Sequence, residues 1–264
     1  MRKLWWFFGI ILLAILSIAA WKGLDSSVYD WEKIPVKKTV SGEIKGFLKS
    51  PTRSLEMFEI NAVTLFPDME KWHSKVPGST DNLIIIKEGV AEILVNEEQK
   101  ILGKGSVIVA GEGIEFTILN HNKSNLVFYI ISFKPFGGTN KTGTSLKTSP
   151  LFVDWKNVEF KPSENGGRRN IMQQKTSVMK ELEIHVTTLK EGLPSHAAHV
   201  HPDEEIILVR KGYVEETIKD EPFRLGPGSI IFLTNDDLHG ISNSGKGECE
   251  YYAIRWLTYQ PGSE

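Results

Sequence analysis

Cysteine is almost absent from this chain of 264 residues, since Cys249 is the only one. A single thiol excludes an intramolecular disulfide and a cluster of thiolate metal ligands. Runs of basic residues are absent too, because 31 Lys and Arg are scattered among 33 Asp and Glu for a formal charge of -2. Nucleic-acid-binding proteins gather their basic residues in a patch or stripe. We therefore expect no nucleic-acid partner.

After the first twenty residues, no segment repeats apolar residues every three or four positions, so this part of the sequence shows no helical periodicity. The chain instead has short β-branched runs separated by Gly, Asn and Asp turns. These runs cover residues 84–86, 93–95, 107–109, 127–131, 206–209, 214–218, 230–233 and 251–256. Closely spaced short strands with turn residues between them predict an all-β sandwich or barrel.

The one long apolar run lies at the N-terminus. Arg2 and Lys3 precede residues 4–20, which end in the small residues Ser17 and Ala19 around one larger residue. This order of features is typical of a signal peptide, so we expect residues 1–20 to direct export to the periplasm or the extracellular space. The run is at the lower limit for crossing a bilayer. An uncleaved membrane anchor formed by residues 4–20 is the alternative.

The sequence repeats itself at a constant offset. Residues 83–89 (LIIIKEG) resemble 206–212 (IILVRKG), and residues 103–109 (GKGSVIV) resemble 226–232 (GPGSIIF), each at a separation of 123 positions. We therefore read two copies of one domain. The first copy is expected over 31–135 and the second over 151–260. Between them, residues 136–150 are rich in Gly, Thr, Ser and Lys, the composition of a linker.

Five of the seven histidines lie between His185 and His239. His199 and His201 are separated by one residue, so an extended segment presents both imidazoles on the same side. Glu205 begins the next apolar strand, and His239 follows a later strand and turn. Three imidazoles and one carboxylate from two hairpins can converge inside a barrel and bind one divalent ion, which we expect to be Mn, Fe, Ni or Zn.

These two segments carry a family resemblance. Residues 199–212 (HVHPDEEIILVRKG) resemble the first motif of the cupin family, with its paired histidines, glutamate and glycine. Residues 228–243 (GSIIFLTNDDLHGISN) resemble the second motif, although Thr234 and Asp236 stand where the family often has proline and glycine. The resemblance implies two tandem jelly-roll (double-stranded β-helix, RmlC-like) barrels, which we expect to pack face to face. A homodimer is compatible with it.

The resemblance also selects Glu205 over Glu204, because the family's glutamate precedes its glycine, here Gly212, by six intervening residues. Glu204 should then point outward, since successive strand residues face opposite ways. Subtracting 123 from the four ligand positions gives Val76, Gly78, Asn82 and Phe116. Such side chains make no useful metal site, so the first copy should bind no metal. His73 and His121 lie elsewhere and are expected on the surface.

Other polar residues of the second copy are candidates for contact with a ligand. Glu183 and His185 share one face of the strand that leads to the motif, and either could act as a general acid or base or face solvent. Four further residues are candidate substrate-binding groups: His196, Arg168, Arg169 and Arg255. The paired arginines would suit a carboxylate by bidentate pairing or form a solvated turn. His196 would be a rim residue or an alternative ligand, and the direction of Arg255 stays open.

Two classes of function fit this site. The first is a metal-dependent enzyme acting on a small carboxylate or sugar-like metabolite, for which the resemblance implies dioxygenase, lyase, isomerase or aminohydrolase chemistry. The second is a non-catalytic binding protein whose metal helps to hold such a ligand. One carboxylate among four ligands leaves the ion a local charge of about +1, which favours an anionic ligand. Glu183 or His185 inside the barrel would favour the enzyme.

Overall fold

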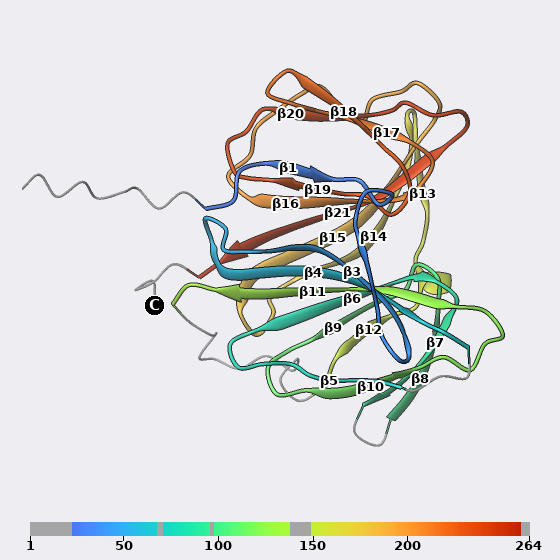
Figure 1. The fold of residues 1–264 in the computed structure, drawn as a ribbon. Helices are drawn as coiled ribbons and strands as arrows, with labels where there is room; N and C mark the ends of the chain where they lie inside the picture. The colour runs from blue at the N-terminus through green and yellow to red at the C-terminus, as the bar shows by residue number, and fades with distance from the viewer. Residues whose placement is uncertain (1–22, 68–70, 96–97, 138–148, 260–264) are drawn as a thin grey trace, which may run out of the picture.

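A computed structural model describes residues 23–67, 71–95, 98–137 and 149–259 and arranges them as two stacked β-barrels (Figure 1). The expected all-β fold is confirmed, with one short 3-10 turn, η2 (Trp155–Asn157), in the described chain. No helix among these residues is long and apolar enough to cross a membrane. The expected signal or anchor segment, residues 1–20, and residues 138–148 of the expected linker lie outside the described residues.

The first barrel consists of a seven-stranded and a four-stranded antiparallel sheet. The larger sheet has the order β12 (Leu151–Val153), β9 (Val107–Ala110), β6 (Asp81–Glu88), β11 (Leu126–Pro135), β4 (Leu55–Leu65), β3 (Gly42–Ser50) and β2 (Val36–Lys38). The smaller sheet has the order β5 (Trp72–Lys75), β10 (Glu115–Leu119), β7 (Val90–Val95) and β8 (Glu98–Gly103).

The second barrel repeats this plan with a seven-stranded and a three-stranded sheet. The larger sheet has the order β1 (Ser27–Tyr29), β19 (Ile230–Leu233), β16 (Glu204–Lys211), β21 (Cys249–Thr258), β15 (Met179–Leu189), β14 (Gly166–Gln174) and β13 (Lys161–Ser163). The smaller sheet has the order β18 (Glu221–Leu225), β17 (Val214–Ile218) and β20 (His239–Asn243).

The two copies match in strand register as well as in sequence. Ile93 on β7 pairs with Ile118 on β10, and Glu216 on β17 pairs with Ile241 on β20. Both members of the second pair lie 123 positions after those of the first. Because a slip of one residue would turn every side chain to the other face, corresponding positions face the same way in both barrels.

Each barrel donates one edge strand to the other. β1, before the first copy, pairs with β19 of the second barrel, whereas β12, after the linker, pairs with β9 of the first. Trp155 follows β12 and packs over Gly105, where a Cβ atom would come within 2.6 Å of the indole. Gly105 also has a φ of +94°, which glycine adopts at little cost. The domain boundaries expected from the repeat remain predictions, and the exchanged strands cross them.

The large sheets of the two barrels pack face to face, as expected. One hydrophobic cluster draws on both, and its aromatic side chains include Phe58 and Phe133 from the first barrel and Phe232 and Trp256 from the second. Its borders carry matched hydrogen bonds. Tyr129 Oη donates to the Gly228 carbonyl over 3.0 Å, and Tyr252 Oη donates to the Gly105 carbonyl over 2.8 Å.

Glu204 ties the metal-binding motif to the first barrel. Its side chain points away from the second barrel's cavity, as strand alternation predicts, but it does not reach solvent, because the residue is 3% exposed. The carboxylate accepts hydrogen bonds from Thr52 Oγ1 at 2.7 Å and from the Arg53 N–H at 2.9 Å. The outer face of this sheet is covered by the other barrel. A side chain that points out of the second barrel from this sheet therefore points into the interface between the two barrels.

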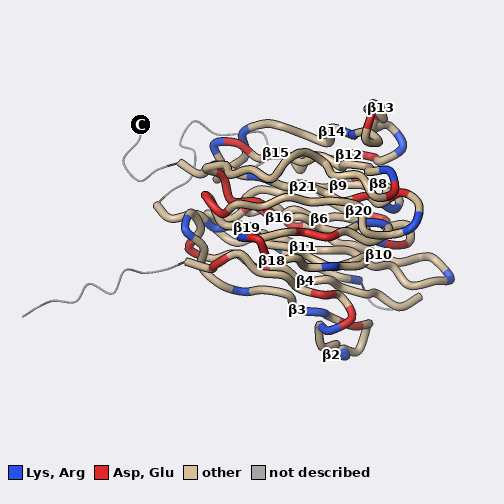
Figure 2. The backbone as a smooth tube through the Cα atoms, turned by 90° about the horizontal axis from the view of Figure 1, so that it is seen from above, with Lys and Arg blue, Asp and Glu red and all other residues tan. Residues whose placement is uncertain are grey.

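Charged residues lie on the strands as well as on the turns that join them. Figure 2 shows Lys and Arg intermixed with Asp and Glu over the described chain. The scattering of charge in the sequence thus carries over to the surface in this view.

Candidate metal centre

His199 and His239 are held together by their own backbones. The two residues form an isolated antiparallel bridge, in which each N–H donates to the other's carbonyl at 3.0 and 3.1 Å. This bridge brings the loop before β16 against the start of β20. It places the imidazole ring centroids 4.7 Å apart. Main-chain geometry therefore fixes the relative position of His199 and His239, two candidate ligands that are forty positions apart in sequence.

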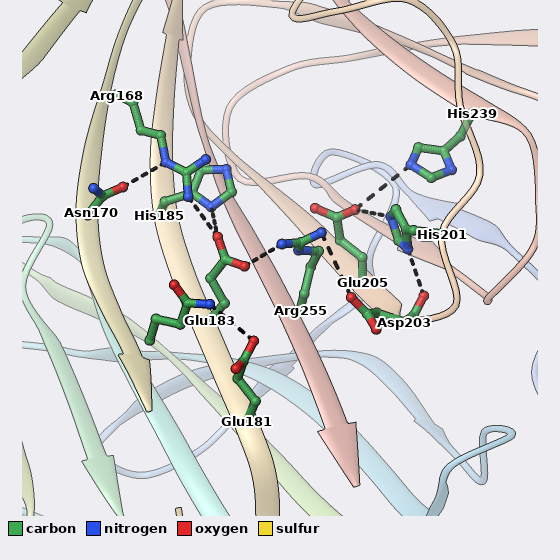
Figure 3. Close-up of polar contacts among 11 residues, drawn as sticks. Arg168, Asn170, Glu181, Glu183, His185, His201, Asp203, Glu205, His239 and Arg255 are labelled. Atoms are coloured by element: carbon green, nitrogen blue, oxygen red, sulfur yellow. Dashed lines mark hydrogen bonds and ion pairs between the residues drawn. The ribbon is translucent and has the colours of Figure 1, made fainter. Parts of the chain in front are cut away.

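His201 and Glu205 complete the group from the β16 side (Figure 3). Nδ1 of His201 lies 3.0 Å from the Asp203 carbonyl, and its Nε2 lies 2.9 Å from Glu205 Oε2. His239 is oriented in the same manner, with Nδ1 2.8 Å from the Asp237 carbonyl and Nε2 3.9 Å from Glu205 Oε2. An imidazole whose Nδ1 donates to a carbonyl presents the lone pair of Nε2, as metal-binding histidines commonly do.

The donor set fits a divalent ion. The ligand atoms of His199, His201 and His239 all lie within 4.8 Å of one another. An ion about 2.0–2.2 Å from each ligand holds them about 3–4.4 Å apart, so a small closure completes the site. Nδ1 of His199 is buried without a hydrogen-bond partner, as suits a nitrogen awaiting a ligand. The loop also follows the motif, because Asp236, at the family's glycine position, has a φ of +67°.

The first barrel lacks such a group among its described residues. Val76, Asn82 and Phe116 are buried at the corresponding positions, and Asn82 Oδ1 accepts a hydrogen bond from Ser132 Oγ at 2.8 Å. His121 is exposed beside Glu92, and His73 is exposed beside Thr117. The structure thus puts these two histidines on the outside of the barrel.

A cavity of about 360 Å³ opens beside the imidazoles. Its inner walls are buried apolar residues, and its mouth carries half-buried or exposed polar residues. The apolar wall consists of Ile207, Leu233, Ile241 and Ala253, while the mouth includes Ser163, Asn165, Arg168 and His196. This volume is at the small end of ligand cavities, which span about 300–1,000 Å³, so the cavity suits a small metabolite.

Glu183 gathers the two arginines of the cavity. Its Oε1 accepts a hydrogen bond from Arg168 at 2.7 Å, and its Oε2 accepts one from Arg255 (Figure 3). Burial would raise the pKa of Glu183, but the hydrogen bonds from Arg255 and Arg168 outweigh it and hold this pKa below its usual range. Glu183 is therefore an anion that orients two guanidinium groups, and Asp203, 3.8 Å from Arg255, adds a second carboxylate beside this trio.

His185 lies beside this trio and lines the cavity. Its Nδ1 is 3.3 Å from Glu183 Oε1 without the geometry of a hydrogen bond. Burial, helped by the charge of Arg168, lowers the pKa of His185 to about 4. The imidazole is therefore neutral at physiological pH and can accept or relay a proton only through a transient cation. Of the two candidate acid–base residues, His185 faces the ligand space and Glu183 lies behind it.

The remaining candidates separate into two places. His196 lies at the exposed rim, with its ring centroid 4.3 Å from that of His199, and Arg255 points into the cavity. The structure does not bring Arg169 there. Its guanidinium lies over the rings of Trp155 and Phe160, at 4.9 and 4.6 Å from their centroids. Neighbouring strand residues face opposite ways, so Arg168 and Arg169 cannot both reach one anion.

One cavity residue had no signal in the motif. Glu216 lies on β17, is 1% exposed and lines the cavity. It stands in a strand with three polar residues in a row between Val214 and Ile218, in which Glu215 and Glu216 are indistinguishable by type. The register of the repeat could have found it, because Glu216 corresponds to the buried apolar Ile93 of the first copy.

Comparison with known proteins agrees with this architecture. Residues 185–255 match a family model described as "Cupin domain". AerE from Microcystis aeruginosa has a similar structure, with a TM-score of 0.65 and 15% identity, covering 89% of this chain and 99% of that one. Protein Ylba from E. coli has a TM-score of 0.69 and 10% identity, covering 89% and 92%.

An oxalate decarboxylase from Lactobacillus farciminis, crystallised as a formate complex, is also similar in structure. Its TM-score is 0.69 at 11% identity, with 89% of this chain and 87% of that chain covered. No curated protein sequence matches this chain. At these identities the solved structures establish the fold alone.

Proposed function

Because the second half of this chain contains a cupin domain beside another barrel of the same fold, we propose that it is a metal-dependent enzyme acting on a small carboxylate or sugar-like metabolite. The observation that carries the proposal is the convergence of His199, His201, His239 and Glu205 beside a cavity that also receives His185. A divalent ion bound there would act as a Lewis acid on an oxygen of the ligand.

The arginines support an anionic ligand. Arg168 and Arg255 both pair with Glu183, and Arg255 also lies 3.8 Å from Asp203. The support therefore comes from Arg168, whose half-exposed guanidinium offers donors to a ligand at the mouth. Guanidinium groups pair with carboxylates through two parallel hydrogen bonds. The solved structures of similar fold include oxalate decarboxylases, whose names state a carboxylate substrate. A small carboxylate is therefore the substrate class we favour.

The position of His185 favours an enzyme over a binding protein, because a neutral imidazole beside the reacting groups can relay a proton. The non-catalytic alternative is a metal-assisted binding protein for the same ligands. One observation favours it: both oxygens of Glu183 are already bound by arginines, so this carboxylate is not free to carry a proton. Turnover of a bound carboxylate distinguishes the two.

Three further parts belong to this proposal. Export to the periplasm or extracellular space, with residues 4–20 as the alternative membrane anchor, follows from the N-terminal sequence. Dioxygenase, lyase, isomerase and aminohydrolase reactions all remain compatible with the ligand set, because a fold does not fix a function. A homodimer of the full chain is the third part, and size-exclusion chromatography with light scattering tests it.

The test uses the full chain, analysed for metal and then screened with small carboxylates and sugars for binding and turnover. Arg168→Ala should weaken carboxylate binding by about 10- to 150-fold, as expected for one or two charged hydrogen bonds. Arg169→Ala is the matched control on the opposite face and should leave this affinity unchanged. Tight binding of neutral apolar ligands only, or equal effects of the two variants, would overturn the proposal for a carboxylate.

A further inference from the structure

The inner end of the cavity contains one carboxyl group in apolar surroundings. Glu216 is 1% exposed, and neither of its oxygens has a hydrogen-bond partner among the described residues. Around it lie the apolar wall residues of the cavity and Tyr251, which is 2% exposed. A buried polar group without a partner is costly for a folded protein. Such a group at the wall of a cavity is best explained by a partner that arrives from outside.

The first barrel shows that the fold does not need a carboxyl group here. At the matching position, with the same cross-strand pairing, stands Ile93, which is 1% exposed within a hydrophobic cluster. The two barrels therefore form an internal control. The barrel without a metal group fills this position with a branched apolar side chain, and the barrel with the metal group places an unsatisfied acid there.

The surroundings define which hydrogen bonds Glu216 can make. Burial raises the pKa of Glu216 well above its usual range and the nearby charge of Glu205 raises it further, while the Gly240 N–H, outside hydrogen-bond geometry, opposes them. The groups that face it from the packed strands are Glu205 on β16, His239 on β20 and Tyr251 on β21. With or without a proton, the carboxyl group accepts a hydrogen bond from a donor group of a ligand.

A ligand that spans this cavity meets different chemistry at its two ends. Toward the mouth it meets Arg168 and Arg255, and at the inner end it meets Glu216 between apolar walls. A hydroxyl group of the ligand donates such a hydrogen bond to the carboxyl oxygens. A bare dicarboxylate or an alkyl chain would leave them unsatisfied, and sites built to bind a hydroxyl reject analogues that lack it.

We propose that Glu216 is a specificity-determining residue, which selects small carboxylates that carry a hydroxyl group and binds that hydroxyl at the inner end of the cavity. The inference rests on the proposed function, because it refines the ligand class of the same site. It assigns the substrate to the hydroxy acids, including the acids derived from sugars. The carboxylate is held toward the arginines, and the hydroxyl reaches the carboxyl group of Glu216.

The experiment compares succinate, malate and tartrate, which share a four-carbon skeleton and differ in hydroxyl groups. Each is titrated calorimetrically into full-length wild-type protein and into Glu216→Ile and Glu216→Gln, all loaded with the same divalent metal. Wild type should bind malate or tartrate at least about 10-fold more tightly than succinate, the effect of one hydrogen bond. Glu216→Ile, which copies the first barrel, should lose this preference while retaining its metal content and its affinity for succinate.

Glu216→Gln keeps the shape and the hydrogen-bonding capacity, so it should retain most of the preference. Thermal unfolding gives a readout independent of ligands: Glu216→Ile should melt at a higher temperature than wild type, because an unsatisfied carboxyl group has been removed. An equal preference for malate over succinate in wild type and Glu216→Ile would contradict this inference alone. If metal-loaded wild type binds none of the three acids, the proposed function itself fails.

Discussion

The two barrels share one frame and differ in a few side chains that face their cavities. In the second barrel, Glu183 pairs with Arg255 across β15 and β21. The same cross-strand pair in the first barrel is Glu59 with Ser132. His185 corresponds to Asn61 in the same way, because their partners are Ala253 and Ile130.

This difference separates the residues that both barrels need for the fold from the residues that form the candidate site in one of them. The glycines of the turns, the strand register and the two tyrosines at the borders of the interface recur in both copies. The imidazoles, the arginines and the buried acid occur in one. The first barrel nevertheless keeps hydrogen-bonding amides and hydroxyls, among them Asn82 and Ser132, where the second has charged or metal-binding groups. Positions that face the cavity can therefore change from charged to neutral polar side chains without loss of the shared frame.

The largest expected effect tests whether metal binding is confined to the second barrel. Purified protein should hold about one divalent ion per chain. His199→Ala or His239→Ala should lower metal affinity by more than the 10- to 100-fold typical of outer-shell changes, because a ligand itself is lost. His121→Ala, in the first barrel, is the control and should have no effect on metal content measured by plasma mass spectrometry. Two ions per chain would contradict the prediction that only the second barrel binds a metal.

The next prediction concerns the carboxylates that cross the interface. Glu204 accepts hydrogen bonds from the Thr52 turn, and Asp81, at the position 123 residues earlier, accepts one from the Val178 N–H at 3.2 Å. Glu204→Ala should lower the free energy of unfolding by about 3 kcal/mol, because buried donors lose their acceptor. Asp81→Ala should act in the same direction.

Chemical denaturation measures both effects, and Glu56→Gln provides the control. Glu56 forms an exposed pair with Lys134, which should contribute about 0–1 kcal/mol. If Glu204→Ala were no more destabilising than this control, the interface would not depend on the buried carboxylate.

A third prediction concerns the pH dependence of stability, to which His185 should contribute and Asn61, its counterpart in the first barrel, should not. The pKa of His185 is about 4 in the folded protein and near its ordinary value of 6.5 in the unfolded chain, so the unfolded chain binds more protons between these values. The stability from the neutral imidazole is complete above pH 6.5 and is lost as pH falls to about 4. This loss amounts to about 3 kcal/mol.

His185→Asn, which copies the first barrel, should remove this part of the pH dependence. Free energies of unfolding of wild-type and variant protein, measured without metal from pH 4 to 7.5, give the difference directly, because other titrating groups cancel. Parallel curves for the two proteins would mean that His185 titrates normally.

The smallest expected effect tests the symmetry of the interface. Tyr129→Phe and Tyr252→Phe each remove one buried hydrogen bond to a glycine carbonyl and should each cost about 1 kcal/mol. We expect the two values to agree within about 0.5 kcal/mol, since the residues occupy equivalent positions in the repeat. A large effect of only one substitution, measured by urea unfolding, would show that the two borders of the interface differ in energy.

The sequence predicted the all-β fold and the repeat because both are written in local patterns. Strand alternation predicted that His199 and His201 share one side of the chain. The constant offset predicted that the first copy has no suitable ligand side chains at the corresponding positions. The same alternation assigned Glu204 to the outside, which was correct for the cavity side but not for exposure. Alternation describes only two faces of a sheet, and it cannot say whether the outer face meets water or a second sheet.

Other features depend on contacts that no local pattern describes. Arg168 and Arg169 look equivalent in sequence, and they were expected at or near a turn. They lie on strand β14 instead, so their side chains point to opposite faces of the sheet. Glu216 stands beside two other polar residues in its strand, so residue type alone does not tell which of them faces the cavity. The exchange of β1 and β12 joins segments that lie far apart along the chain, and no motif marks it.

That exchange also governs the order in which the chain can fold. Ser27 pairs with Phe232, so the first described strand waits for residues that are synthesised 205 positions later. The first barrel likewise lacks its edge strand until β12 has emerged. Contacts of such long sequence separation slow folding, since loop-closure entropy is lost before they form. Neither barrel can mature as an independent unit during synthesis, and the unpaired edges of β9 and β19 need protection from aggregation until the whole chain is available.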